Sequence, residues 1–584
     1  MDAIQSTYSE LNQSPGLENY NTFLSDNALR AALRREGAGW ATDELTVYGA
    51  LTGRGEFIRL GFQANEYRPR LSTHDAKARR VDLVEYHPAY HELLGGAIRH
   101  GLHSRPWTEQ RAGSHVARAA FNYLQTQVEA GHGCPLTMTF AAMPTLRKQP
   151  KLAALWEPLV TAREYDPRNV PVSEKPGVTI GMAMTEKQGG SDVRANTTQA
   201  TPLASAGPGE RYVLRGHKYF VSAPMSDAFL VLAQAPGGLS CFLLPRWLPD
   251  GTKNAIELQQ LKRKMGNVSN ASAEVELRDA HAWLVGDEGR GVANILEMVA
   301  LTRFDCMVAS AAGMRQAVAQ VTHHAAYRQT FGKRLDQHPL MQNVLADLAM
   351  ESEAALALSF RTARALDHLA DDSEAALFRL LTPIGKYWVC KRAPAHAYEA
   401  MECLGGSGAI ETSILSRLYR EAPINAIWEG SGNIQCLDLF RAIQRQPDGL
   451  DAVIEELNAA AGMNDLYDRH RRHLGTLLMS ARQHSDAPRS VYEGRQLMQS
   501  LALGLQASLL LRGDNAAVAE AFCQGRLSSG ASGLFGALPQ GVPSAAIIER
   551  ARPLLSAKQE PSAVAVEPDT PPPHGVAGRC GNRD

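Results

Sequence analysis

The spacing of apolar residues changes twice along this chain, and the order of those changes limits the folds that it can adopt. Residues 25–178 carry apolar positions at helical spacing, as in 90–102. Residues 179–290 instead contain short β-branched or alternating runs, such as 211–222, separated by Gly, Pro and Asp. Helical spacing returns in residues 291–445. A strand block between two helix blocks predicts an α+β fold, with a middle β-domain between an N-terminal helical domain and a C-terminal helical bundle.

The ends of the chain differ from this central pattern. Residues 1–24 are predicted to be an N-terminal arm, and residues 446–555 continue the helical pattern as a C-terminal extension. Residues 556–584 are rich in Pro, Ala, Glu and Gly, which predicts a disordered tail. Residues 81–88 end in a proline, which is tolerated in a first helical turn, so we expect a loop leading into a helix. Other predicted elements are strands at 228–234, 239–244 and 273–277 and helices at 117–128, 340–369, 374–401 and 491–512.

Composition excludes several classes of protein. The chain has 584 residues, of which 44% are hydrophobic and 21% charged, as is typical of a globular protein with several domains. Its formal net charge is −1, so it has no overall positive charge that would attract nucleic acid. Its eight cysteines are scattered and form no Cys-x-x-Cys pair, and His323 and His324 point different ways on a helix, so no metal site is expected. No leader peptide or membrane-spanning run is evident in the sequence, which predicts a cytoplasmic protein that does not enter a membrane.

The segment 181–193 is the most specific motif for binding a small molecule. It contains Thr185 and Glu186, followed by two glycines, Ser191 and an aspartate. Such a loop brings backbone amides and a hydroxyl close to a pyrophosphate, although a Gly-Gly-Ser-Asp sequence alone is more often a plain turn. The strand at 211–222 then supplies an aromatic residue, Phe220, that would count as a core residue if it stood alone.

Taken together, these two segments resemble the Thr-Glu-x-x-x-Gly-Ser-Asp and Gly-x-Lys-x-aromatic-Ile-Thr/Ser signatures of the acyl-CoA dehydrogenase family. The resemblance implies an FAD cofactor whose ring meets hydrogen-bond donors at its polar edge and an aromatic surface at its face. It implies that Thr185 bonds the pyrimidine side, Ser191 the pyrophosphate and Ser222 the N5 region, with Phe220 against the ring. The implied cofactor residues of this region are Met182, Met184, Thr185, Ser191, Phe220, Val221 and Ser222.

Two further segments resemble family elements that reach the FAD of a neighbouring subunit. Residues 327–333 match Arg-x-x-Phe-Gly-Lys, which implies that Arg328 and Phe331 contact the cofactor of a partner in a homotetramer. The glycine cluster at 404–408 implies a similar role for Gly406. From the residues alone, these segments could equally be an exposed helix end and a helix C-cap.

The strongest catalytic motif lies at 427–435, where Trp-Glu-Gly-Ser-Gly-Asn-Ile-Gln resembles the family's Tyr/Trp-Glu-Gly-Thr/Ser-x-x-Ile-Gln. The resemblance implies that Glu429 removes the α-proton of an acyl-CoA thioester while the β-hydride passes to flavin N5. Trp428 offers apolar cover that would raise the carboxyl pKa towards neutrality. Ser431 and Asn433 are implied to lie near the adenylate of FAD.

A second position for the base occurs in one branch of the family, on the helix that contains residues 301–305. Thr302 cannot serve as a base, and Asp305 is more simply interpreted as one half of an ion pair with Arg303 or another basic neighbour. Glu429 is therefore the predicted base.

The C-terminal extension, together with the sequences at 84–91, 184–193, 266–272, 301–306 and 427–433, resembles an adaptive-response branch of the family. That branch is associated with DNA alkylation and binds double-stranded DNA. This resemblance implies an alternative function, a protective DNA-binding flavoprotein with little dehydrogenase activity. Arg469, Arg471 and Arg472 form a basic cluster that could contact phosphates or could be a solvated helix face. Between residues 441 and 556 the basic and acidic residues nearly balance, so charge alone does not favour DNA.

Overall fold

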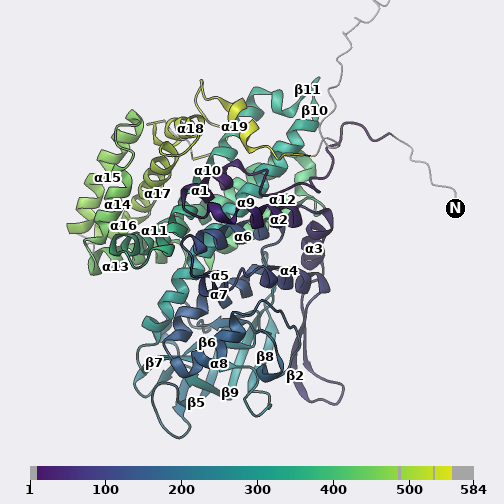
Figure 1. Ribbon diagram of the computed structural model, residues 1–584, viewed down its shortest axis with the longest axis vertical. Helices are drawn as coiled ribbons and strands as arrows, with labels where there is room; N and C mark the ends of the chain where they lie inside the picture. Colours follow the sequence, from purple (N-terminus) through teal and green to yellow (C-terminus); the bar gives the residue numbers. More distant parts are fainter. Residues whose placement is uncertain (1–8, 484–487, 531–532, 556–584) are drawn as a thin grey trace, which may run out of the picture.

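The computed structural model describes residues 9–483, 488–530 and 533–555, and the predicted tail at 556–584 lies outside them. Helices come first in the chain, then a sheet, and then long helices that cross the middle of the molecule (Figure 1). The N-terminal helices are α1 (Asn27–Arg35), α2 (Thr42–Thr52), α3 (Gly55–Glu66), α4 (Pro88–Arg99), α5 (Arg105–Thr108), α6 (Ser114–Val128), α7 (Gly133–Arg147) and α8 (Pro150–Val160).

The sheet is a seven-stranded layer at one end of the molecule (Figure 1). Its strands are β3 (Ile180–Ala183), β4 (Gln199–Pro202), β5 (Arg211–Ser222), β6 (Ala228–Ala235), β7 (Gly238–Pro245), β8 (Ile256–Leu261) and β9 (Ser272–Leu284). Their order is β3-β6-β4-β5-β9-β7, with β8 on β9, and β3 runs parallel to β6. Strand β7 also pairs antiparallel with β6, so the strands from β6 to β7 form a closed ring. The predicted strands are present, and β9 is longer than the segment at 273–277.

The C-terminal bundle contains long helices that pack on one another and on the N-terminal helices. Its members are α9 (Gly291–Tyr327), α10 (Pro339–Asp367), α11 (Asp372–Cys403), α12 (Ile414–Ile427) and α13 (Gly432–Arg445). Asp371 starts α11 because its side chain accepts hydrogen bonds from the backbone N–H groups of Ser373 and Glu374. Between α9 and α10, the short strands β10 (Gln329–Thr330) and β11 (Lys333–Arg334) form a hairpin.

The C-terminal extension is helical and shares the core of the bundle. It consists of α14 (Gly449–Asn458), α15 (Asp465–Gln483), α16 (Pro488–Tyr492), α17 (Gly494–Leu511), α18 (Ala516–Leu527) and α19 (Ser544–Ala551). Leu457, Leu474 and Leu501 belong to the same buried cluster as the bundle residues. Arg361 of α10 bonds Glu456 of α14 at 2.9 Å, and both side chains are buried. The extension is therefore packed into the protein and is not a separate unit.

The interpretation of residues 81–88 as a loop was wrong. Strand β2 (Arg80–Glu85) pairs antiparallel with β1 (Arg70–His74) and makes a hairpin inside the N-terminal region. Its sequence places Leu83 and Val84 among polar residues, a strand pattern too short to stand out from the helical segments on either side. The predicted helix does begin at Pro88. Within the described residues, no helix combines the length and apolarity that crossing a membrane requires.

Candidate active site

A cavity of about 850 Å³ lies where the sheet meets the helices. Strands β3 and β5 line one part of it, helices α6, α7, α9 and α12 line other parts, and the loop between α12 and α13 also contributes. The cavity collects residues that are far apart in the sequence. The predicted site residues that line it are Met182, Met184, Thr185, Ser191, Phe220, Ser222, Glu429 and Ser431.

Glu429 lies in the loop between α12 and α13 with φ of +57°, which is unusual for a residue other than glycine. The surrounding side chains hold this backbone in place. Arg303 Nε donates to the Glu429 carbonyl oxygen at 2.8 Å, and Lys386 Nζ donates to the Gly430 carbonyl oxygen at 2.8 Å. Gln435 Nε2 also donates to the Gly430 carbonyl, at 2.8 Å. Strained conformations that neighbours fix in this way are common at functional sites.

The Glu429 carboxyl group faces the interior of the protein. Burial raises its pKa above the ordinary value, while a hydrogen bond from Thr302 and the charges of Arg303 and Lys386 act in the opposite direction. Thr302 Oγ1 lies 2.8 Å from Glu429 Oε2. The neighbouring Trp428 bonds Asn425 through its indole N–H at 3.0 Å and lines the same cavity. A carboxyl group whose pKa is raised by burial is suited to accept a proton near neutral pH.

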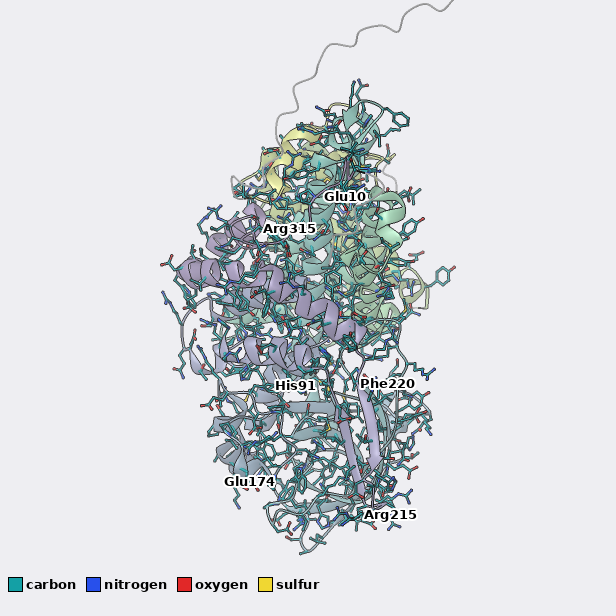
Figure 2. The ribbon with its side chains drawn as sticks, turned by 90° about the vertical axis from the view of Figure 1, so that its right-hand side faces the viewer. Glu10, His91, Glu174, Arg215, Phe220 and Arg315 are labelled. Carbon is teal, nitrogen blue, oxygen red and sulfur yellow. The ribbon has the colours of Figure 1, made fainter. Side chains whose placement is uncertain are left out.

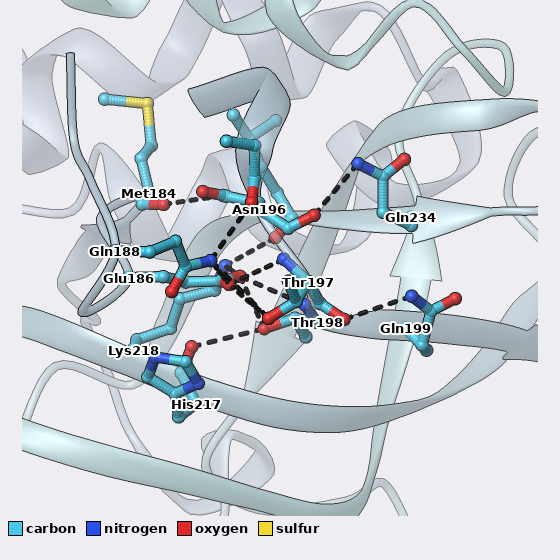
Figure 3. Close-up of polar contacts among 12 residues, drawn as sticks. Met184, Glu186, Gln188, Asn196, Thr197, Thr198, Gln199, His217, Lys218 and Gln234 are labelled. Carbon is cyan, nitrogen blue, oxygen red and sulfur yellow. Dashed lines mark hydrogen bonds and ion pairs between the residues drawn. The ribbon is translucent and has the colours of Figure 1, made fainter. Parts of the chain in front are cut away.

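The loop that carries Thr185 and Ser191 is held by Glu186, as Figure 3 shows. The Glu186 carboxylate is buried and accepts hydrogen bonds from Lys218 Nζ at 2.8 Å, Thr198 Oγ1 at 2.6 Å and the Thr197 backbone N–H at 2.7 Å. Burial alone would raise its pKa, but Lys218 and these donors hold it at about 2. Gly190 allows the loop to fold tightly, because a Cβ atom there would lie 2.7 Å from Thr185 Oγ1.

Strand β5 presents alternate residues to the cavity. Phe220 and Ser222 line it, whereas Val221 points to the opposite face and is buried in the core of the sheet. Figure 2 shows Phe220 near the level where sheet and helices meet, well away from Arg215 on the same strand. The side chain of Val221 is therefore not part of the cavity.

Besides Val221, four predicted cofactor residues lie outside the cavity of this chain. Phe331 is 96% exposed at the β10–β11 hairpin, and Arg328 bonds the Asn12 carbonyl at 2.7 Å. Gly406 is exposed in a short 3-10 helix, and Asn433 Oδ1 accepts a hydrogen bond from Arg495 at 2.8 Å. The structure of one chain thus does not bring them to the other site residues.

Asp305 forms an ion pair, as predicted, but its partner is Arg118 and not Arg303. Arg118 Nη2 lies 2.7 Å from Asp305 Oδ2, a second guanidinium nitrogen contacts the other carboxylate oxygen, and Thr137 donates to the same carboxylate. Arg303 instead pairs with Asp438 at 2.8 Å. Both carboxylate oxygens of Asp305 are engaged by these contacts, so Asp305 stabilises the packing of α6 on α9 and is not available as a base.

Sequence reasoning missed several residues that shape the site. Lys386 and Gln435 bond backbone carbonyls of the Glu429 loop. Gln435 ends the 427–435 motif, which was the available signal for it, whereas no local pattern distinguishes Lys386 from other helical residues. Glu421 lines the cavity, and burial together with the charge of Glu129 raises its pKa to about 7. A carboxyl group on a largely apolar helix such as α12 was the one available signal for Glu421.

Comparisons with known proteins agree with this arrangement. Three family models match in succession: the adaptive response protein AidB N-terminal domain at residues 12–167, the acyl-CoA dehydrogenase middle domain at 181–280 and the acyl-CoA dehydrogenase C-terminal domain at 289–444. The chain belongs to the acyl-CoA dehydrogenase family of flavoprotein oxidoreductases, whose cofactor is FAD.

Within this family the chain is related to AidB. The putative acyl-CoA dehydrogenase AidB of Escherichia coli is 46% identical over 520 residues, which cover 89% of this chain and 94% of the relative. The crystal structure of Caenorhabditis elegans ACDH-11 in complex with C11-CoA has a TM-score of 0.80 at 27% identity and covers 90% of this chain and 93% of its own. An acyl-CoA dehydrogenase complexed with FAD from Bacillus anthracis, 19% identical with a TM-score of 0.62 over 75% of this chain and 80% of its own, shares the fold.

The residues of the cavity fit FAD. Its volume of about 850 Å³ is sufficient for a large cofactor together with part of a substrate. Thr185, Ser191 and Ser431 provide hydroxyl groups for the polar parts of the cofactor, and the 46% exposed ring of Phe220 provides an aromatic surface. Gly190, which lines the cavity beside these hydroxyls, has no side chain to cover the loop there.

Proposed function

We propose that this protein catalyses α,β-desaturation of an acyl-CoA thioester, with Glu429 as the base. The observation that carries the proposal is the partly buried Glu429 carboxyl, with its raised pKa, in the same cavity as Thr185, Ser191 and Phe220. A protein that kept FAD for structural reasons alone would need the last three residues but would have no use for a buried carboxylate at the reacting centre.

In the proposed reaction, ionised Glu429 removes the α-proton, the β-hydrogen leaves with its electron pair, and a carbon–carbon double bond forms between the two carbons. FAD, when bound, supplies the hydride acceptor at its N5 position. Thr302 orients the carboxylate, while Arg303 and Lys386 keep the loop in its strained conformation. Their hydrogen bonds fix the base relative to the cavity before substrate enters.

The thioester carbonyl gains negative charge as the α-proton leaves, so the site needs a donor for that oxygen. The backbone N–H of Glu429 is the candidate. The hydrogen bonds of α12 end one residue earlier, where the Trp428 N–H bonds the Ile424 carbonyl at 3.1 Å. The positive φ of Glu429 then turns the chain away from the helix.

Anaerobic titration with acyl-CoAs tests this function. Short, branched and long acyl-CoAs are added to the FAD-loaded protein, to Glu429→Gln and to the exposed-site control Glu174→Gln, and the visible flavin absorbance is recorded. We expect bleaching by at least one thioester in the wild type and the control, and its loss in Glu429→Gln. Bleaching that persists in Glu429→Gln, or none with any thioester, contradicts the proposal.

A homotetramer is part of the same proposal. The side chain of Phe331 is 96% exposed, and adding a Cβ to Gly406 meets no atom within 4 Å, so both are available to a partner. Together with Arg328 and Asn433, they would complete the cofactor site from a neighbouring subunit. A cytoplasmic location, expected from the sequence, also stays a proposal.

The alternative, DNA binding by the extension, is favoured by one observation. Arg469 and Arg472 are exposed on α15, whereas Arg471 is half-buried and pairs with Asp468 at 3.4 Å. Exposed arginines on one helix are suited to contact phosphates. Binding of duplex DNA at two salt concentrations, compared between wild type, a double Arg469→Glu, Arg472→Glu variant and the ion-paired control Arg482→Glu, tests it. Equal binding by all three proteins, or none, rules this surface out.

A further inference from the structure

The cavity continues beyond Glu429 along one face of α9. Thr302, which contacts Glu429, is followed on that face by Cys306, Ser310 and Gly313, all of which line the cavity. Their spacing of three or four residues keeps them on one side of the helix. At a rise of about 1.5 Å per residue, Gly313 lies about 16 Å along the axis from Thr302.

Helix α6 covers this far part of α9. Arg118 of α6 contacts Asp305 of α9, and Tyr123 of α6 lies with Arg315 at a second, smaller cavity. The two helices therefore run in the same direction across their contact. Residues of α6 just beyond Arg118 consequently face the part of α9 that follows Asp305.

Asn122 and Thr126 are those residues, and they lie four positions apart on one face of α6. Both line the cavity, although they are only 7% and 9% exposed. Within the described part of the chain, neither side chain has a hydrogen-bond partner. The polar atoms of both side chains are accessible from the cavity and are not enclosed in the core. Buried amides and hydroxyls usually have partners, so both groups are placed to bond something inside the cavity.

The opposite side of this region is also polar. Asn425 of α12 donates to Ser310 Oγ at 3.2 Å, and both residues line the cavity. Two carboxyl groups line the cavity near this region. Asp305 is already neutralised by Arg118 and bonded by Thr137, and burial raises the pKa of Glu421, one helical turn from Asn425, to about 7. The hydrogen-bonding groups of the region itself are neutral, and we name Asn122, Thr126, Ser310, Gly313 and Asn425 the distal pocket.

We propose that the distal pocket binds the far end of an acyl chain that carries a neutral hydrogen-bonding group, such as a terminal hydroxyl. The proposal rests on the proposed function, because it assumes that the thioester lies beside Glu429. The Asn122 amide both donates and accepts, and the Thr126 hydroxyl does the same, so one ligand hydroxyl can donate to one residue and accept from the other. A plain alkyl end would leave them without partners.

Non-oxidisable 3-thia-acyl-CoAs separate this proposal from catalysis, because binding is measured without turnover. Two chain-length series, one with plain termini and one with terminal hydroxyls, are titrated calorimetrically into the FAD-loaded full-length protein. We expect the hydroxylated ligand to bind at least about tenfold more tightly at the length that reaches the pocket. In the double variant Asn122→Leu, Thr126→Val this preference should disappear, while the plain ligand binds at least as tightly as before.

Thr161→Val, outside the cavity, is the control and should keep the wild-type preference. Bound FAD and the melting temperature report whether each variant folds, and the single variant Thr126→Val replaces the double variant if the latter does not. Equal affinity for the two series at every length in the wild type overturns this inference but leaves the proposed function standing. If no analogue of either series binds, the proposed function fails as well.

Discussion

Thr302 Oγ1 lies 2.8 Å from Glu429 Oε2 and 3.0 Å from the carbonyl oxygen of Val299 in its own helix. One hydroxyl hydrogen can serve only one of these acceptors at a time. When Glu429 is ionised, Thr302 donates to it. When Glu429 is protonated, the carboxyl donates to Thr302, which then donates to Val299. Thr302 can therefore accommodate both protonation states of the base without moving.

Thr302→Val should shift the pH dependence of flavin reduction. Burial raises the pKa of Glu429, and the hydrogen bond from Thr302 opposes that rise. Without the hydroxyl the pKa rises further, so the rate should increase with pH at values about one unit higher than in the wild type, as expected for loss of one hydrogen bond to a charged group. Stopped-flow reduction at several pH values measures the shift. Thr302→Ser should keep the wild-type profile, and an unshifted Thr302→Val profile would show that the hydroxyl does not tune the base.

Glu186→Gln should weaken both the fold and FAD retention. The carboxylate pairs with buried Lys218 and organises the loop that carries Thr185 and Ser191. Leaving the Lys218 ammonium without its partner is expected to cost about 3 kcal/mol. Thermal unfolding and the FAD content per chain measure the two effects, with the exposed Glu210→Gln as control. A variant with unchanged FAD content would mean that the loop holds its shape without this pair.

The same pair predicts an acid-dependent loss of stability. Because the pKa of Glu186 is held at about 2, below its ordinary value, the ionised form contributes stability above about pH 4.5, and that contribution is lost as the pH falls towards 2. Chemical unfolding at pH 6 and at pH 3.5 should therefore differ more for the wild type than for Glu186→Gln. An identical difference in the two proteins would contradict the assignment.

Glu421→Gln should become more stable than the wild type as the pH rises, the opposite of the trend expected from Glu186. Burial and the charge of Glu129 raise the pKa of Glu421 from 4.5 to about 7, so the fold prefers the protonated form and loses stability as the pH rises from about 4.5 to about 7. The amide cannot ionise, and its oxygen can still accept the Asn267 N–H, which lies 2.7 Å from Glu421 Oε1. Relative to wild type, the variant should gain up to about 3 kcal/mol between pH 5 and pH 8. A constant difference across that range would refute the raised pKa.

Phe331→Asp should impair assembly. A nearly fully exposed phenylalanine that becomes buried between subunits contributes about 2 kcal/mol, and a charge in its place would oppose that burial. Light scattering after size exclusion, together with FAD content, should report smaller species with less cofactor. Leu155→Asp, at another exposed apolar position, provides the control. Unchanged assembly of Phe331→Asp would remove this hairpin from the interface.

The order of helices, sheet and helices was predictable because hydrophobic spacing depends on local geometry. That Glu429, Thr185 and Ser191 lie in one cavity was predictable because their motifs are contiguous in the sequence. Lys386 and Asn122 were not, because each reaches the site across a helix contact that only the folded chain creates. The β1–β2 hairpin was missed because its strands are short and lie among helices. The roles of Arg328, Phe331, Gly406 and Asn433 stay predictions, since they depend on neighbouring subunits.

The contact between Arg361 and Glu456 makes the bundle depend on the C-terminal extension. Arg361 lies on a helix of the bundle, yet it pairs with a residue of the extension in the protein interior. A descendant that lost the extension would leave this guanidinium with Glu374 alone and expose apolar residues of α10 and α11 to water. Deletion of the segment would therefore be viable only together with compensating substitutions in the bundle. The extension is therefore expected to be inherited together with the bundle that it covers.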